Sequence, residues 1–214
     1  MPATDDLEQL AAAADACRGC GLWKQATQAV FGEGRPAASL MLVGEQPGDV
    51  EDREGRPFVG PAGRLLDRVL EAAEIPRSEA YVTNAVKHFK WVGRGKRRIH
   101  QKPREDEIDA CGPWLVTELK IVQPQVLVLL GATAAQGLLG RSFRVTQMRG
   151  EILEDTGLAP YVMATVHPSS VLRAPDDEQR RAGIQQLAEE FRRIAPLLHD
   201  GDSRAGRPGR GRAK

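Results

Sequence analysis

Residues 39–48, SLMLVGEQPG, decide the fold, because a short apolar run leads directly into a glycine-bounded turn. A run of this length is too short for a globular helix, and the glycines and proline that follow end it. Three further runs have the same form: AYVT at 80–83, VLVLL at 126–130 and YVMATV at 161–166. Continuous apolar runs of this kind are typical of parallel strands that are buried on both faces.

Amphipathic helical patterns separate these predicted strands. Residues 63–74, GRLLDRVLEAAE, place their apolar side chains on one stripe, and residues 104–120 and 177–198 behave similarly. A short helix is expected at 132–139. Strands that alternate with helices predict right-handed crossovers and a parallel sheet with helices on both faces. Residues 143–155 alternate in polarity, and we expect them to add a small hairpin at one edge.

The length of 214 residues suits one domain, which we place at 1–200, followed by a disordered basic Gly/Arg tail at 201–214. No apolar run approaches the roughly 18 residues that a membrane-spanning helix needs. The acidic start, MPATDDLEQL, does not have the form of a signal peptide. We therefore expect a cytoplasmic monomer with no membrane partner.

The net charge of +1 hides two basic segments, the tail and residues 87–104. The second segment contains no acidic residue, and its basic members are Lys87, Lys90, Arg94, Lys96, Arg97, Arg98, Lys102 and Arg104. Local patches of this kind attract a polyanion even when the overall charge is small. The alternative is a solvated surface with no partner.

Unusual residues follow each predicted strand directly. They are Gly44–Gly48 after the first strand, 84–88 after the second, 131–133 after the third and 167–170 after the fourth. Turn chemistry alone explains any one of them. The carboxyl ends of parallel strands meet at one edge of the sheet, where such folds build their sites. Four such turns on one edge therefore predict an active site.

Three stretches in this order resemble the uracil-DNA glycosylase superfamily, in particular its iron–sulfur branch. They are GEQPGDVEDREGRPFVGPAGRLL at 44–66, TNAVKH at 83–88 and HPSSVLR at 167–173. The resemblance runs from about Cys17 to Arg173. It implies a three-layer α/β/α sandwich around a four-stranded parallel sheet, and excision of uracil from DNA.

The motif residues suit that reaction, in which a flipped base must be stacked and read in a pocket. Phe58 can stack on the pyrimidine, and the Asn84 amide carries both the donor and the acceptor that match the edge of uracil. His167 can stabilise charge at O2 of the leaving base. The simpler alternatives are core packing for Phe58, a strand-end cap for Asn84 and a His-Pro turn for His167. The substrate-binding set is completed by Gly44, Ser169 and Ser170, the two serines being expected at DNA phosphates.

Cys17, Cys20 and Cys111 cannot form a complete set of disulfides, and the Cys17–Cys20 pair indicates metal or redox chemistry instead. The iron–sulfur glycosylases have a fourth cysteine shortly after the TN-x-V-K motif, and His88 occupies that place here. Spacing alone favours a structural zinc with three cysteines and one histidine. The resemblance implies a [4Fe–4S] cluster held by Cys17, Cys20, His88 and Cys111, with zinc as the alternative.

Two departures from the family pattern bear on the reaction. The best-known uracil glycosylases have an aspartate in the first motif that activates the attacking water, whereas this chain has Gln46, which cannot take a proton. We still count Gln46 in the predicted catalytic set, with Glu45, His100 and His167. An insertion at 93–102 carries KRRIH, which together with GEQPG and TNAVKHF resembles the UdgX group, where a loop histidine is linked covalently to the DNA sugar. His100 takes that role by position. Glu45 is expected to orient His100 or to stabilise the developing positive charge.

The same insertion supplies Lys96, Arg97 and Arg98, which we expect to seat the loop on DNA phosphates. The resulting prediction is a glycosylase that excises uracil and becomes attached through His100 to C1′ of the abasic-site sugar. Two alternatives remain. One is an ordinary multiple-turnover uracil-DNA glycosylase, in which His100 sits in a DNA-gripping loop. The other is a non-catalytic, metal-containing DNA-binding protein.

Overall fold

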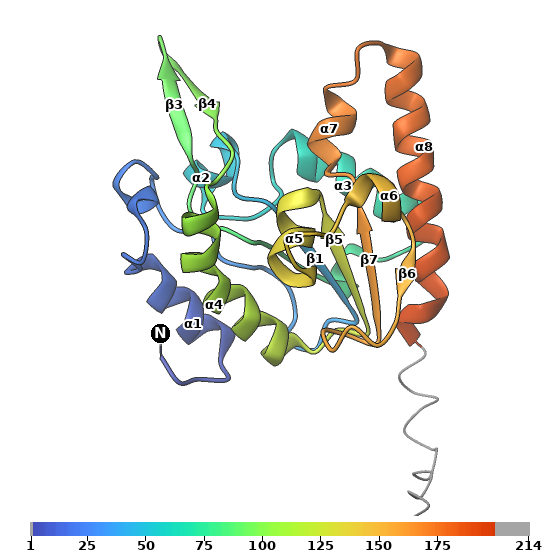
Figure 1. Ribbon diagram of the computed structural model, residues 1–214, viewed down its shortest axis with the longest axis horizontal. Coiled ribbons are helices and arrows are strands. Elements are labelled where there is room, and N and C mark those ends of the chain that lie inside the picture. Colours follow the sequence, from blue (N-terminus) through green and yellow to red (C-terminus); the bar gives the residue numbers. More distant parts are fainter. Residues whose placement is uncertain (1, 200–214) are drawn as a thin grey trace, which may run out of the picture.

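The computed structural model describes residues 2–199, so the predicted tail at 201–214 lies outside the described residues. Its centre is a sheet in the order β2-β1-β5-β7-β6 (Figure 1). The four predicted strands are confirmed and are mutually parallel. Their bounds are Leu40–Gly44 for β1, Ala80–Asn84 for β2, Val126–Leu130 for β5 and Tyr161–Thr165 for β7.

A fifth strand at the edge corrects the prediction for residues 143–155. This segment forms a short helix, α6 (Val145–Met148), and a two-residue strand, β6 (Ile152–Leu153), instead of a hairpin. Strand β6 pairs antiparallel with β7, so Ile152 lies opposite Met163 and Leu153 opposite Val162. The alternation in polarity therefore comes from a single edge strand that pairs with a strand of the main sheet.

Helices cover both faces of the sheet, which confirms the α/β/α sandwich (Figure 1). Helices α3 (Pro61–Ala72) and α8 (Asp177–Ile194) pack on the face that Leu40 and Leu42 present. Helices α4 (Glu105–Val122) and α5 (Ala132–Leu139) pack on the opposite face, where Met41 and Val43 point. Because alternate side chains of a strand point to opposite faces, each strand contributes to two separate hydrophobic cores.

Several short elements surround this sandwich. An N-terminal helix, α1 (Leu7–Asp15), packs against α4. The others are α2 (Asp49–Glu54), α7 (Pro168–Leu172) and the 3-10 turns η1 (Gly21–Lys24), η2 (Arg77–Glu79) and η3 (Ala195–His199). Across residues 2–199, no helix has the length and apolar character needed to cross a membrane.

The basic insertion folds as a hairpin, a form that the sequence reasoning did not foresee. Strands β3 (Trp91–Arg94) and β4 (Arg97–His100) pair antiparallel around the two-residue loop Gly95-Lys96. Gly95 has a φ of +61°, a conformation that tight hairpin loops require and that glycine adopts without strain. The hairpin projects from the end of the sheet that also carries α7 (Figure 1).

Strand order places the switch point of the sheet between β1 and β5. The chain leaves β1 for β2 on one side and then returns across β1 to form β5 on the other side. In open α/β sheets, ligands bind in the crevice at the carboxyl ends of strands beside such a point. The turn that begins with Gly44 and Glu45 lies there.

Candidate active site at the carboxyl edge of the sheet

The four turns that the sequence singled out come together at one edge. Gly44 lies opposite Asn84 in the parallel register of β1 and β2. The Thr133 hydroxyl, after β5, donates a hydrogen bond to the Glu45 carboxylate. A Cβ placed on Gly131 would lie 3.2 Å from the Cβ of His167, so the turns after β5 and β7 also touch. The chain therefore builds one continuous site from four separate segments.

Gly44, Phe58 and Asn84 form the closest-packed part of the site. A Cβ on Gly44 would lie 2.4 Å from the Asn84 Oδ1 and 2.7 Å from the Phe58 Cζ. Only glycine leaves room for the aromatic ring and the amide to meet at the end of β1. Phe58 is buried and has a φ of +57°, a strained backbone conformation for a bulky residue. The three predicted pocket residues are thus brought into contact.

His167 caps helix α7 and faces Phe58. The two rings are stacked, with centroids 5.9 Å apart and an angle of 26° between their planes. The Ser169 backbone N–H donates to the His167 Nδ1 over 3.1 Å, and the Ser169 hydroxyl lies 2.9 Å from the same nitrogen. Because Nδ1 accepts, the neutral ring carries its proton on Nε2. His167 thus offers a donor on its other ring nitrogen.

The electrostatic environment keeps His167 neutral. Burial, together with the nearby Arg173 and His100, lowers its pKa to about 4, although Glu45 acts in the opposite direction. An uncharged imidazole can still donate a hydrogen bond to an oxygen that gains negative charge. His167 can therefore act as a hydrogen-bond donor without carrying a positive charge of its own.

This low pKa predicts a pH-dependent stability. The unfolded chain binds a proton at His167 more readily than the folded chain, since the ordinary pKa of 6.5 lies above the folded value of about 4. We therefore expect the free energy of unfolding to fall as the pH drops from 6.5 towards 4, by at most about 3 kcal/mol from this residue. Chemical denaturation at about pH 7 and about pH 5 measures this loss.

The variant His167→Asn provides the control for that prediction. Asparagine cannot titrate in this range, yet its side-chain oxygen can still accept the Ser169 N–H as an N-cap. The variant should lose less stability than the wild type between the two pH values. An equal loss in both proteins would contradict the assignment to His167.

Glu45 and His100 lie side by side at the base of the hairpin. The His100 Nε2 is 3.3 Å from the Glu45 Oε1, while the second carboxylate oxygen accepts from Thr133. Burial by itself raises the pKa of Glu45, but the hydrogen bonds from His100 and Thr133 outweigh it and hold the pKa below its usual value. Glu45 is therefore ionised, and its carboxylate contacts His100, whose side chain is half exposed.

The hairpin presents two different faces, because alternate side chains of a strand point in opposite directions. Trp91, Arg98 and His100 share the face that contacts the body of the protein. Arg97 and Ile99 lie on the opposite, exposed face. The strand period therefore decides which of two adjacent arginines meets the protein.

Arg98 corrects the predicted set of phosphate-contacting residues. Its guanidinium bridges the Asp49 carboxylate and the Asp52 carboxylate, the latter at 2.6 Å, and also donates to the Asp49 carbonyl. Asp52 is fully buried, so this bond anchors the hairpin to α2. Arg98 is occupied by protein carboxylates, whereas Lys96 and Arg97 remain exposed near the tip. Only the latter two stand free to meet a phosphate chain.

Gln46 is engaged with the backbone at both ends of the hairpin. Its amide nitrogen donates to the Gln101 carbonyl over 3.0 Å and to the Lys90 carbonyl over 3.3 Å. Its amide oxygen accepts the Lys90 N–H over 3.1 Å. Gln46 was predicted as a catalytic residue, but its buried amide ties both ends of the hairpin to the end of β1. This is a positioning role, which an aspartate could fill only in part because it has no donor.

The predicted phosphate-binding serines differ in their surroundings. Ser170 is exposed and donates to the His167 carbonyl over 2.7 Å. Ser169 is engaged with the His167 ring, as described above, and is less exposed. Both lie in the first turn of α7, so they surround His167 at the mouth of the site.

The predicted metal ligands share one neighbourhood. Cys111 is buried in the apolar cluster between α1 and α4, and Cys17 and Cys20 pack against that cluster. The Lys87 N–H donates to the Cys111 Sγ over 3.4 Å, so the segment that contains the next residue, His88, passes beside Cys111. Burial raises the pKa of Cys20, and it raises that of Cys111 to about 11. Burial lowers the pKa of His88, which favours a neutral imidazole.

These donors fit a metal centre by type but do not form a coordination geometry. Thiols and a neutral imidazole around an apolar pocket are the ligand types of zinc and iron–sulfur sites. In the part of the chain that is described, however, no three His, Cys, Asp or Glu side chains are arranged to hold a metal ion. The structure thus gathers the three cysteines at one apolar cluster, and the segment that carries His88 passes beside Cys111.

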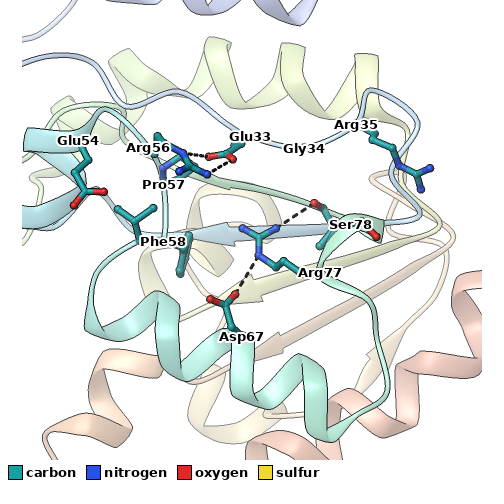
Figure 2. A pocket seen from close by; sticks show the side chains of 12 residues that line it. Glu33, Gly34, Arg35, Glu54, Arg56, Pro57, Phe58, Asp67, Arg77 and Ser78 are labelled. Atoms are coloured by element: carbon teal, nitrogen blue, oxygen red, sulfur yellow. Dashed lines mark hydrogen bonds and ion pairs between the residues drawn. The ribbon is translucent and has the colours of Figure 1, made fainter.

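A hollow of about 660 Å³ is lined in part by Phe58 (Figure 2). Neither Asn84 nor His167 lines it. Two of its arginines are paired with carboxylates: Arg56 with Glu33 at 2.6 Å and Arg77 with Asp67 at 3.2 Å. The paired charges make it a poor phosphate site.

Comparison with known proteins shows the family to which this chain belongs. The model of the uracil DNA glycosylase superfamily matches residues 31–192, and the chain belongs to this superfamily. Two relatives are named type-4 uracil-DNA glycosylases. The protein from Sulfurisphaera tokodaii is 35% identical over 200 residues, covering 90% of this chain and 85% of the relative. The protein from Thermotoga maritima is 36% identical over 172 residues, covering 80% and 85%.

A more distant relative belongs to another type. A type-5 uracil-DNA glycosylase from Pyrobaculum aerophilum is 29% identical over 175 residues, with 74% of this chain and 71% of the relative covered. The family assignment thus agrees with the sandwich fold and with the resemblance in the three motifs.

Sequence reasoning missed several residues of the site. Asp49 and Asp52 anchor Arg98, and Thr133 holds Glu45. The acidic run directly after GEQPG was a visible signal, since a buried arginine in the basic insertion needs carboxylate partners. The partnership itself depends on the hairpin register and was not readable from the sequence.

Proposed function

We propose that this protein excises uracil from DNA. The observation that carries the proposal is the single site in which Phe58, Asn84 and His167, from three separate motifs, meet beside Gly44. The type-4 and type-5 relatives, named as uracil-DNA glycosylases, support the same substrate. A flipped uracil has a ring to stack, an edge to read and a carbonyl oxygen to stabilise, and these residues offer one group for each.

The chain's own residues account for bond breaking. Phe58 stacks on the uracil ring, and the Asn84 amide pairs with its O4 and N3–H edge. The bond between C1′ and N1 breaks, and its electron pair leaves with the base. The neutral His167 donates its Nε2–H to O2 of uracil, where the negative charge collects.

We further propose that His100 captures the sugar. A ring nitrogen of His100 gives its lone pair to C1′ and forms a carbon–nitrogen bond as the base departs. The ring gains positive charge, and the ionised Glu45 beside it balances that charge. Gln46 cannot take a proton from water, and its amide is already occupied by the hairpin backbone. The histidine therefore competes with a water molecule that lacks a base at that position.

A second function has a specific observation in its favour. Relatives that cover most of this chain are named type-4 uracil-DNA glycosylases, and nothing in their names implies capture. In this alternative, water completes the reaction and the enzyme turns over. His100 then assists only by position.

Denaturing gel electrophoresis after incubation with uracil-containing and uracil-free oligonucleotides separates these functions. A shifted protein band that depends on uracil indicates capture. An unshifted protein with an alkali-cleavable abasic site indicates turnover. A protein that binds DNA but does neither is a DNA-binding module, and that result would overturn the proposal.

We propose that Cys17, Cys20, His88 and Cys111 hold a [4Fe–4S] cluster, with zinc as the alternative. When bound, either centre has a structural function at this place. The donors join the loop after α1 to helix α4 and to the segment that leads into the hairpin. The centre thereby links the N-terminal segment to the base of the basic insertion.

The metal proposal predicts a brown protein with broad visible absorbance and about four irons per chain. Elemental analysis and the visible spectrum measure both properties. The variant Cys111→Ala should lose the absorbance together with much of its solubility, because a structural metal site contributes folding free energy directly. A colourless folded wild-type protein that contains one zinc would contradict the cluster and support the alternative.

A further inference from the structure

A fully buried ion pair lies directly behind Asn84. The side chains of Lys87 and Glu118 are 1% and 0% exposed, and the ammonium contacts the Glu118 Oε2. Burying two charges removes their solvation, and apolar side chains of similar volume often stabilise a core equally well or better. The pair therefore suggests a task other than overall stability.

Glu118 gathers hydrogen-bond donors from several parts of the chain. The Gly32 N–H donates to its Oε1 over 3.2 Å, the Tyr81 hydroxyl over 2.9 Å and the Thr83 hydroxyl over 2.8 Å. These donors belong to a loop and to strand β2, whereas Glu118 itself lies on α4. One carboxylate thus joins three elements that are far apart in sequence.

Lys87 completes the network at the end of β2. Its ammonium donates to the Asn84 carbonyl over 2.8 Å and to the Thr83 hydroxyl over 2.7 Å. Lys87 belongs to the basic segment expected to attract a polyanion, but it is buried and directs its charge inward. It cannot contact DNA in this position.

The position of β2 at the edge of the sheet explains why the Asn84 carbonyl needs a donor such as Lys87. Strand β2 lies at the edge of the sheet and pairs with β1, and within residues 2–199 its outer side has a single isolated bridge, between Glu33 and Val82. Asn84 is its last residue, so its carbonyl lies beyond that bridge. A strand end with one neighbour opens more easily than a central strand. The Lys87 ammonium supplies the donor that a second strand would otherwise provide.

The turn after Asn84 is hydrogen-bonded to the end of β1. The Ala85 N–H donates to the Gly44 carbonyl over 2.9 Å, and the Val86 N–H donates to the Glu45 carbonyl over 3.0 Å. Holding this turn therefore also holds the end of β1. The pocket glycine, the base-reading amide and the residue that orients His100 share one support.

We propose that Lys87 and Glu118 are positioning residues that hold the Asn84 amide in its base-reading place, so that α4 sets the rate of uracil excision. This inference rests on the proposed function and deepens it. Helix α4 contacts the same segment at a second point, where the Lys87 N–H donates to the Cys111 Sγ. The base-reading group is thereby built onto a helix of the core, although it stands at a sheet edge.

The test uses the double variant Lys87→Met/Glu118→Gln. Removing one partner alone leaves an unpaired buried charge and risks unfolding, whereas the double change removes both charges together. The glutamine oxygen still accepts from Tyr81, but the donor to the Asn84 carbonyl is gone. We expect the single-turnover rate of uracil release to fall about 10- to 100-fold, with unchanged affinity for DNA.

Amide hydrogen exchange gives a readout that does not depend on activity. In the double variant the Ala85 and Val86 amides should exchange faster, while the amides of the central strand β5 stay protected. The matched control is Tyr81→Phe, which removes one donor to Glu118 and leaves all three contacts of the Lys87 ammonium in place. It should keep the wild-type rate within about 3-fold.

A double-mutant cycle with Asn84→Ala decides whether the pair acts through Asn84. If it does, the Lys87→Met/Glu118→Gln change lowers the rate less than about 2-fold in the Asn84→Ala background. A loss there as large as in the wild type, or unchanged exchange at Ala85 and Val86, overturns the inference. If the wild type releases no uracil, the proposed function fails, and the hydrogen exchange still decides the positioning claim.

Discussion

Replacing His100 with serine should abolish the covalent adduct and leave uracil release intact. The reason lies in the separation of tasks within the site. His100 stands on the hairpin beside Glu45, whereas Phe58, Asn84 and His167 surround the base from three other segments. A nucleophile that is held in place has an effective concentration that a loosely held water cannot match. Without the imidazole, water has no competitor for C1′.

The expected result is therefore a conversion from capture to release. Denaturing gels should show no shifted band for His100→Ser, and alkali treatment should reveal an abasic site. For the wild type, peptide mapping of the cross-linked species should place the attachment on His100. Attachment at another residue would defeat this mechanism. A variant that neither cross-links nor releases uracil would show that His100 takes part in bond breaking itself.

Replacing Asn84 with alanine should have the largest effect on base recognition. A site built around specific hydrogen bonds leaves its polar groups unpaired when a partner is lost, and this penalty exceeds the loss of the contact alone. We expect uracil release to lose at least ~2 kcal/mol of transition-state stabilisation, which corresponds to a roughly 30-fold lower rate. Single-turnover kinetics on a uracil oligonucleotide measures this change.

The control for this prediction is Ser170→Ala. Ser170 is exposed at the mouth of the site, and its hydroxyl donates to the His167 carbonyl. It should alter DNA affinity mildly and leave the rate at saturating DNA close to that of the wild type. If Asn84→Ala keeps the full rate, the amide does not read the base.

The strands and main helices were accessible from the sequence because their signals are local. An apolar run such as 126–130 carries its own evidence of burial on both faces, and the stripe in 63–74 shows which side of a helix meets a core. Residues 143–155 were misjudged because an edge strand with a partner in the main sheet has the same alternation as half of a hairpin.

The site was predictable in position more than in detail. Parallel strands bring their carboxyl ends to one edge, so the turns holding Gly44, Asn84 and His167 had to converge. The roles of Gln46 and Arg98 were not predictable in this way. Gln46 binds the backbone at Lys90 and Gln101, which are distant in sequence, and nothing near Gln46 indicates that contact.

The sequence by itself thus determined the sandwich, the edge that carries the site and the residue types available there. Only the tertiary structure decided how adjacent residues divide their tasks. Arg97 and Arg98 are chemically identical, yet the hairpin register points one outward and buries the other against Asp52. Lys87 and Glu118 pair because β2 and α4 pack together. Local patterns report on burial and direction, whereas partners far apart in the chain are chosen by packing and register.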